Sequence, residues 1–145
     1  MTSVEEWSKF PDGLDYYSKT WYPKGTLKAT LLFIHGLGEH INRYNHVFPI
    51  FAEAGIKVLG FDERGFGKTG KKGGILGHNG GIDQVLADIA AVEGRIKVPG
   101  IPHFVMGQSM GGGLALKYAS TQPAGLTGVI ATCNLYHPLH GSAPD

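Results

Sequence analysis

Apolar residues occur along this chain in two patterns, short continuous runs and positions at helical spacing. Continuous apolar and β-branched runs cover residues 29–34, 56–62, 102–107 and 126–133, and such runs are typical of strands buried on both faces of a parallel sheet. Helical spacing occurs between them, at residues 44–52, 82–89 and 114–118. The first helix is expected to begin near residue 46, with Pro49 in its first turn, and to end before Gly55.

The N-terminal segment has a different pattern, because aromatic residues gather at residues 14–21 and the turn sequence YPKGT follows them. This segment predicts a hairpin arm. The strands and helices that alternate after it predict right-handed βαβ units. The expected fold class is therefore α/β, with a mostly parallel sheet, helices on both faces and an N-terminal antiparallel arm. Ligands of such sheets bind beyond the carboxyl ends of the strands, where HGLG, DERGFG and GQSMG fall.

The segment GFGKTG at residues 65–70 matches the dinucleotide pattern GxGxxG, and its GKT imitates the end of a phosphate-binding loop. KKGG follows, so we expect no helix here whose N-terminus could hold a phosphate. Asp62 also stands where the phosphate-loop pattern requires glycine. We expect Asp62 and Arg64 to hold a strand-to-loop corner together instead. Nucleotide binding stays a third hypothesis, which thermal stabilisation by nucleotide would test.

The segment GQSMG at residues 107–111 matches GxSxG, and its context is more informative than its letters. The apolar run HFVM precedes it and the helical stretch GGGLALKYA follows it. A strained strand-to-helix turn of this kind exposes the serine oxygen above the sheet, which makes Ser109 a candidate nucleophile. We expect Gly107 and Gly111 to leave room where a Cβ would strike a neighbouring strand or helix.

A serine nucleophile needs hydrogen-bond donors for the oxyanion that forms when it attacks a carbonyl group. One donor comes from the residue after the serine and the other from a loop after an earlier strand, here HGLG at residues 35–38. The Leu37 and Met110 amides are the candidate pair. His35 and Gly36 precede Leu37, and we expect His35 to be a hydrogen-bonded supporting residue rather than a metal ligand.

Composition narrows the classes of function. The 145 residues suit one domain, and 13 basic against 12 acidic residues give no field that favours nucleic acid. The single cysteine, Cys133, excludes an intramolecular disulfide framework and fits a reducing compartment. No apolar run approaches the ~20 residues of a membrane span. The histidines show neither an i, i+4 pair nor accompanying cysteines, so we predict no metal and no other cofactor.

With HGLGEH, FDERGFGKT and GQSMGG in this order, the chain resembles the α/β-hydrolase superfamily, specifically monoacylglycerol lipase-like enzymes of the serine aminopeptidase S33 group, in a fungal-looking form. The resemblance runs from about residue 15 to residue 133. It implies an incomplete α/β-hydrolase fold, with Ser109 as nucleophile and the Leu37 and Met110 amides as the oxyanion hole. Thr69 replaces the usual serine of the second motif. Residues 134–145 form an atypical tail of the single expected domain, 1–145.

The resemblance also implies what the chain lacks. The acid and the histidine of the triad follow the serine in this fold, whereas here His137 and His140 precede the last residue, Asp145. We therefore expect the N-terminal half of a serine hydrolase of carboxylic esters, inactive alone because its base is missing. We do not expect His137 or His140 to act as that base. The alternative is a non-catalytic truncated product that binds or regulates a full-length hydrolase.

The implied partner is a small lipid or ester substrate, with no nucleic acid and no transmembrane segment. The expected location is cytoplasmic. The alternative is a lipid droplet or membrane surface, to which the protein would bind by peripheral lipid association. The sequence does not indicate an oligomeric state. The segment GVIATC, residues 128–133, is expected to form an exposed apolar strand edge that is liable to aggregate.

Overall fold

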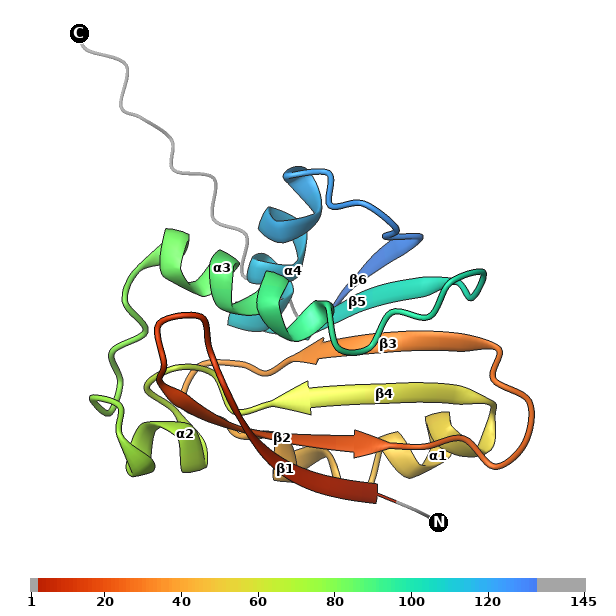
Figure 1. Cartoon of the computed structure of the whole chain (residues 1–145), viewed down its shortest axis with the longest axis horizontal. Helices are drawn as coiled ribbons and strands as arrows, with labels where there is room; N and C mark the ends of the chain where they lie inside the picture. Colours follow the sequence, from red (N-terminus) through yellow and green to blue (C-terminus); the bar gives the residue numbers. More distant parts are fainter. Residues whose placement is uncertain (1–2, 133–145) are drawn as a thin grey trace, which may run out of the picture.

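The computed structural model describes residues 3–132, and a six-stranded sheet in the order β1-β2-β4-β3-β5-β6 runs through it (Figure 1). The strands are β1 (Ser3–Lys9), β2 (Asp15–Trp21), β3 (Ala29–Ile34), β4 (Ile56–Phe61), β5 (His103–Gln108) and β6 (Gly128–Thr132). The β1–β2 and β2–β4 pairs are antiparallel, and β4, β3, β5 and β6 are parallel to one another. The predicted fold class, a mostly parallel sheet with an antiparallel arm, is confirmed.

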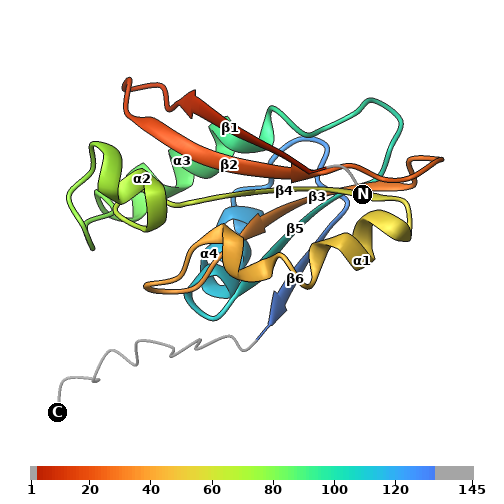
Figure 2. The ribbon, with the colours of Figure 1, turned by 90° about the horizontal axis from the view of Figure 1, so that it is seen from below.

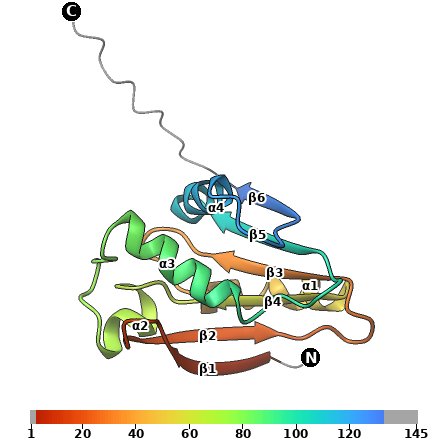
Figure 3. The same ribbon diagram turned by 45° about the horizontal axis from the view of Figure 1, so that its top comes forward.

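Helices cover both faces of this sheet. They are the 3₁₀ helix η1 (Ile41–Tyr44) and the α-helices α1 (Phe48–Glu53), α2 (Gly67–Lys72), α3 (Ile82–Glu93) and α4 (Met110–Ser120). One buried cluster joins alternate strand residues such as Leu32 and Val105 to α3 and α4, and a second joins Leu31 and Phe33 to η1 and α1. Figure 3 shows α3 in front of the sheet and α1 behind it. The helix predicted near residue 46 is α1, with Pro49 in its first turn.

The N-terminal arm differs from the prediction in one respect. The hairpin consists of β1 and β2, and its turn precedes β2 rather than following it at YPKGT. Phe10 N–H donates to Leu14 O at 2.9 Å, and Gly13 supplies the positive φ of 91° that the turn requires. The sequence pattern did not reveal β1 because its side chains are almost all exposed and therefore do not alternate.

A short helix, α2, follows β4, where the sequence predicted none. It begins at Gly67 and contains two glycines, which have low helix propensity. Hydrogen bonds to Asp62 hold its first turn: Lys68 N–H donates to Asp62 Oδ2 and Thr69 Oγ1 donates to Asp62 O, both at 2.7 Å. The prediction was wrong because tertiary contacts outweigh the propensity of this segment.

The carboxyl ends of β3, β4 and β5 meet at one end of the sheet, and the three glycine-rich segments follow them there. The sheet twists strongly, so that β6 is inclined to β1 and β2 (Figure 2). Within residues 3–132, β1 and β6 stand at the two ends of the strand order. The candidate site therefore lies at the centre of the sheet, between β3 and β5.

Candidate functional site

Ser109 lies at the single residue between β5 and α4, which is the turn that the sequence predicted to expose a nucleophile. Its backbone has φ 54° and ψ −118°, a conformation that costs a non-glycine residue of order 1–3 kcal/mol. Ser109 N–H donates to Thr132 O at 2.8 Å, and Ser109 O accepts from Gly112 N–H at 2.9 Å. The sheet and the first turn of α4 thus hold the strained residue in place, with its side chain half-buried.

Two glycines make this turn sterically possible. A Cβ on Gly107 would overlap Gly111 O, and a Cβ on Gly111 would overlap Ile34 O. Both obstacles are backbone atoms of packed elements, which cannot move aside as a flexible side chain does. Any larger residue at either position would therefore push α4 away from β5 and β3 and shift Ser109.

The loop after β3 carries the second part of the candidate site. Gly36 N–H donates to Glu39 Oε2 at 2.8 Å, and Glu39 N–H donates to Gly36 O at 3.2 Å, so the loop closes on itself around Leu37. Tyr44 O–H also donates to Glu39 Oε2, at 2.8 Å. Burial by itself raises the pKa of Glu39, but the hydrogen bonds from Tyr44 and Gly36 hold that pKa below its usual value. Glu39 belongs to the HGLGEH motif, but its role in closing this loop was not predicted from the sequence.

His35 supports the loop from beneath and is fully buried. Its Nε2 accepts a hydrogen bond from Glu63 N–H at 3.0 Å, so the proton of the neutral ring sits on Nδ1, which lies 2.8 Å from Gly36 O. Burial lowers the pKa of His35, which keeps the ring neutral. Both ring nitrogens are therefore occupied, and His35 has no free nitrogen with which to act as a base.

The Glu63 carboxyl group lies beside His35 and was not singled out from the sequence. Its Oε2 is 3.0 Å from His35 Nδ1, but neither carboxyl oxygen makes a hydrogen bond within the described structure. Burial, and after it the charge of Asp62, raises the pKa of Glu63 well above its usual value. Burial of the Glu63 carboxyl group under the loop thus favours its neutral form.

The two amides predicted to form an oxyanion hole both belong to turns. Within residues 3–132, neither Leu37 N–H nor Met110 N–H donates a hydrogen bond. Leu37 is 70% exposed, and Met110 is the first residue of α4. Both loops follow neighbouring parallel strands, β3 and β5. The site therefore offers unpaired N–H groups beside an exposed turn, where the positive end of a helix favours negative charge.

Asp62 and Arg64 hold the corner after β4, as expected, but each uses different partners. The Asp62 carboxylate accepts from Ile41 N–H and from Lys68 N–H, both at 2.7 Å. Arg64 pairs with Asp88 and Asp12 at 2.8 Å each. A carboxylate of the chain itself thus occupies the N-terminus of α2, where a phosphate would have to sit. This arrangement disfavours the nucleotide hypothesis even though α2 exists.

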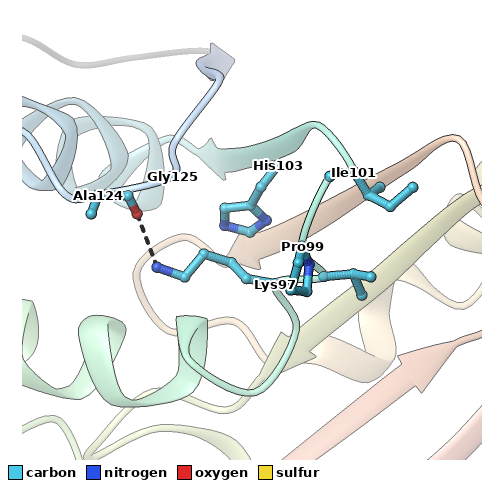
Figure 4. Close-up of a pocket in the computed structure, with 8 residues that line it drawn as sticks. Lys97, Pro99, Ile101, His103, Ala124 and Gly125 are labelled. Atoms are coloured by element: carbon cyan, nitrogen blue, oxygen red, sulfur yellow. Dashed lines mark hydrogen bonds between the residues drawn. The ribbon is translucent and has the colours of Figure 1, made fainter.

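A cavity of about 380 Å³ lies at the other end of the sheet, before β5 and β6. Figure 4 shows Lys97 reaching across it to Ala124 O, a hydrogen bond of 3.0 Å. His103 lines this cavity, with Nδ1 2.8 Å from Thr30 Oγ1 and Nε2 3.1 Å from Glu93 Oε1. Because Ser109 follows the carboxyl end of β5, this cavity belongs to the opposite end of the strands.

Several predictions concern features beyond this geometry. Cys133, His137, His140 and Asp145 lie outside the described residues. Within residues 3–132, no three histidine, cysteine, aspartate or glutamate side chains gather as a metal site would require. None of the helices in this range has the length and apolar character that crossing a membrane requires.

Comparison with known proteins identifies the family of this chain. The profile of the serine aminopeptidase S33 family matches residues 25–144. A putative monoglyceride lipase of Schizosaccharomyces pombe is 43% identical over 122 residues, which are 81% of this chain and 32% of that protein.

Solved structures agree with this match. A thermostable carboxyl esterase from Bacillus coagulans has a TM-score of 0.75 at 29% identity, over 89% of this chain and 43% of the esterase. A soluble variant of monoglyceride lipase from Saccharomyces cerevisiae has a TM-score of 0.69 at 26% identity, over 82% of this chain and 38% of the lipase. These neighbours are α/β hydrolases, and this chain spans less than half the length of each of these three proteins.

Proposed function

The chain belongs to the serine aminopeptidase S33 family, and on that premise we propose that it carries the nucleophile and oxyanion hole of a serine hydrolase of carboxylic esters, with monoacylglycerols as the substrate class. The observation that carries this proposal is the strained backbone of Ser109 between β5 and α4. The similar proteins named above, a putative monoglyceride lipase and a carboxyl esterase, support the substrate class.

The proposed reaction begins when Ser109 Oγ attacks the ester carbonyl carbon. A C–O bond forms, the hydroxyl proton passes to a base, and the carbonyl oxygen becomes an oxyanion. The Leu37 and Met110 N–H groups hold that oxyanion, and one such donor contributes about 3 kcal/mol to lowering the barrier. Collapse of the intermediate breaks the ester C–O bond and releases the alcohol, which takes the proton. Water then hydrolyses the acyl-enzyme and restores Ser109.

The same proposal assigns the base to a residue outside 3–132. Within this range no hydrogen bond joins a histidine to Ser109. His35 has both nitrogens occupied, and His103 lies at the opposite end of the strands. Loss of the triad histidine costs a serine hydrolase on the order of 10⁶ in turnover. We do not expect His137 or His140, which follow residue 132, to act as that base, and we therefore expect the 145-residue chain to be close to inactive by itself.

A fluorophosphonate probe tests both parts of this proposal when it is used with and without millimolar imidazole. Free imidazole can replace a missing base, so we expect slow labelling without it and faster labelling with it. Mass spectrometry would locate the label on Ser109. Circular dichroism would show that each sample is folded.

Two variants serve as controls for this experiment. Ser109→Ala is expected to abolish the imidazole-dependent label. Ser120→Ala, which changes a serine at the far end of α4, is expected to keep it. Labelling that persists in Ser109→Ala would overturn the nucleophile. Rapid labelling of Ser109 without imidazole would keep the nucleophile and overturn the expected inactivity of the chain by itself.

A further inference from the structure

Glu63 contacts the ring of His35 at both of its nitrogen atoms. The Glu63 backbone N–H donates to His35 Nε2 at 3.0 Å, and Glu63 Oε2 lies 3.0 Å from His35 Nδ1. The backbone N–H requires an unprotonated Nε2, so the ring carries its proton on Nδ1 and the imidazolium form is disfavoured. A residue of the corner after β4 thus fixes the tautomer of the first residue after β3.

The proton on His35 Nδ1 has two acceptors within reach. Gly36 O lies 2.8 Å from Nδ1 and accepts a hydrogen bond, whereas Glu63 Oε2 lies 3.0 Å from Nδ1 and accepts none within the described residues. Hydrogen bonds to an ionised acceptor are roughly twice as strong as those to a neutral one. The charge of the Glu63 carboxyl group therefore decides how firmly the Nδ1 proton stays on Gly36 O.

Gly36 O belongs to the same peptide group as Leu37 N–H. This trans peptide is planar, so its C=O and N–H point in opposite directions and turn together. Hydrogen bonds from His35 Nδ1 at 2.8 Å and from Glu39 N–H at 3.2 Å hold the carbonyl oxygen. They also polarise the peptide group, which makes its N–H a stronger donor. His35 thus acts on Leu37 N–H through the carbonyl group of Gly36.

The surroundings of Glu63 and His35 favour a neutral carboxyl group. The titratable groups that face this pair are Asp62, Asp88 on α3, and Glu39 and His40 on the loop after β3. The three acids among them have donors of their own, which are backbone N–H groups, Arg64 and Tyr44. Burial, and after it the charge of Asp62, raises the pKa of Glu63. Ionisation of Glu63 is therefore shifted to a higher pH than that of an ordinary glutamate.

We propose that Glu63 is a positioning residue for the oxyanion hole, because it controls the orientation of Leu37 N–H through the ring of His35. This role rests on the proposed function, in which Leu37 N–H binds the oxyanion. While the carboxyl group is neutral, the Nδ1 proton stays on Gly36 O and the peptide group keeps its orientation. When the carboxyl group ionises, Oε2 draws that proton away, and the peptide group loses one of the two hydrogen bonds that hold it.

The rate at which the fluorophosphonate probe labels Ser109 tests this role when it is measured over a range of pH at a constant concentration of unprotonated imidazole. We expect the rate constant of the unaltered chain to fall about tenfold as pH rises through the pKa of Glu63, which is less than the 10²–10³ lost when a whole donor is removed. Glu63→Gln keeps the shape of the side chain but forms no anion, so this fall is expected to disappear. Glu53→Gln is the matched control, because Glu53 is an exposed acid at the end of α1, and it is expected to keep the profile of the parent.

Nuclear magnetic resonance of the unaltered chain tests the same role without the probe and without a variant. We expect the Leu37 amide signal and the His35 Nδ1 signal to shift together as Glu63 ionises. A Leu37 signal that does not follow that of His35 would overturn the positioning role. Equal pH profiles of labelling in the parent and Glu63→Gln would also overturn it and would keep Ser109 as the nucleophile. Absence of labelling at every pH would instead overturn the proposed function.

Discussion

The corner after β4 and the corner after β5 are both glycine-rich turns from a buried strand into a helix. At the first, the Asp62 carboxylate accepts Lys68 N–H at the start of α2 and also Ile41 N–H. At the second, Ser109 is held at positive φ and Met110 N–H has no acceptor within the described residues. A helix N-terminus that its own chain fills is structural, whereas one left open beside a strained serine is available to a ligand. The first corner thus stabilises the fold, whereas the second carries the proposed nucleophile.

The largest expected effect comes from adding a methyl group at the β5 corner. In Gly111→Ala the new Cβ would overlap Ile34 O, a backbone atom in the central strand. We expect the free energy of unfolding to fall by about 3 kcal/mol or more. Urea denaturation followed by circular dichroism measures this. Gly94→Ala is the control, because the nearest atom outside its chain neighbours, Ala91 O, would lie 3.6 Å from the new Cβ, and an equal loss there would contradict the steric argument.

Removal of the carboxylate at the β4 corner tests the other half of the comparison. Asp62→Ala leaves Ile41 N–H and Lys68 N–H without their charged acceptor. We expect a loss of about 2 kcal/mol in the free energy of unfolding. Asp83→Ala is the matched control, since Asp83 is an exposed acid in the first turn of α3 and is expected to lose less than about 1 kcal/mol. Equal losses of unfolding free energy in the two variants would mean that Asp62 stabilises the fold only through its charge near the N-terminus of a helix.

These corners also show how far the sequence predicts the fold. The parallel strands and α1, α3 and α4 follow from apolar spacing, because their buried positions face a core. The sequence did not predict β1, whose exposed side chains carry no such signal, or α2, which Asp62 and Thr69 hold through hydrogen bonds. The spacing of apolar residues predicts which positions are buried. It does not predict hydrogen bonds between segments that are distant in the sequence.

The candidate site, like the fold, could be predicted from the sequence only in part. Ser109 and its flanking glycines lie within five consecutive residues, so the sequence alone indicates their turn. The contact between His35 and Glu63 joins loops after two different strands. Only the pairing of β3 with β4 brings those loops together, and no local pattern predicts it.

The buried Glu63 carboxyl group is expected to give the β4 corner a pH dependence. Burial and the charge of Asp62 raise the pKa of Glu63 above its unfolded value near 4.5. The folded state then keeps a proton that the unfolded state releases, so stability falls as pH rises from the unfolded pKa to the folded one. We expect Glu63→Gln to remove this part of the slope. Thermal melts across this pH range measure it, and an unchanged slope would mean that Glu63 is ionised in the folded chain.

The smallest expected effect is a gain, and it belongs to the β5 corner. Ser109→Gly removes the Cβ that makes φ 54° costly, and we expect the free energy of unfolding to rise by up to about 1 kcal/mol. Ser109→Ala keeps the Cβ and the strain, so its stability is expected to match the parent. Chemical denaturation of the three chains makes this comparison, and a loss of stability in Ser109→Gly would mean that the serine side chain stabilises its own turn. A gain would show that the backbone is strained at Ser109. This is the residue whose side-chain oxygen the proposed chemistry uses.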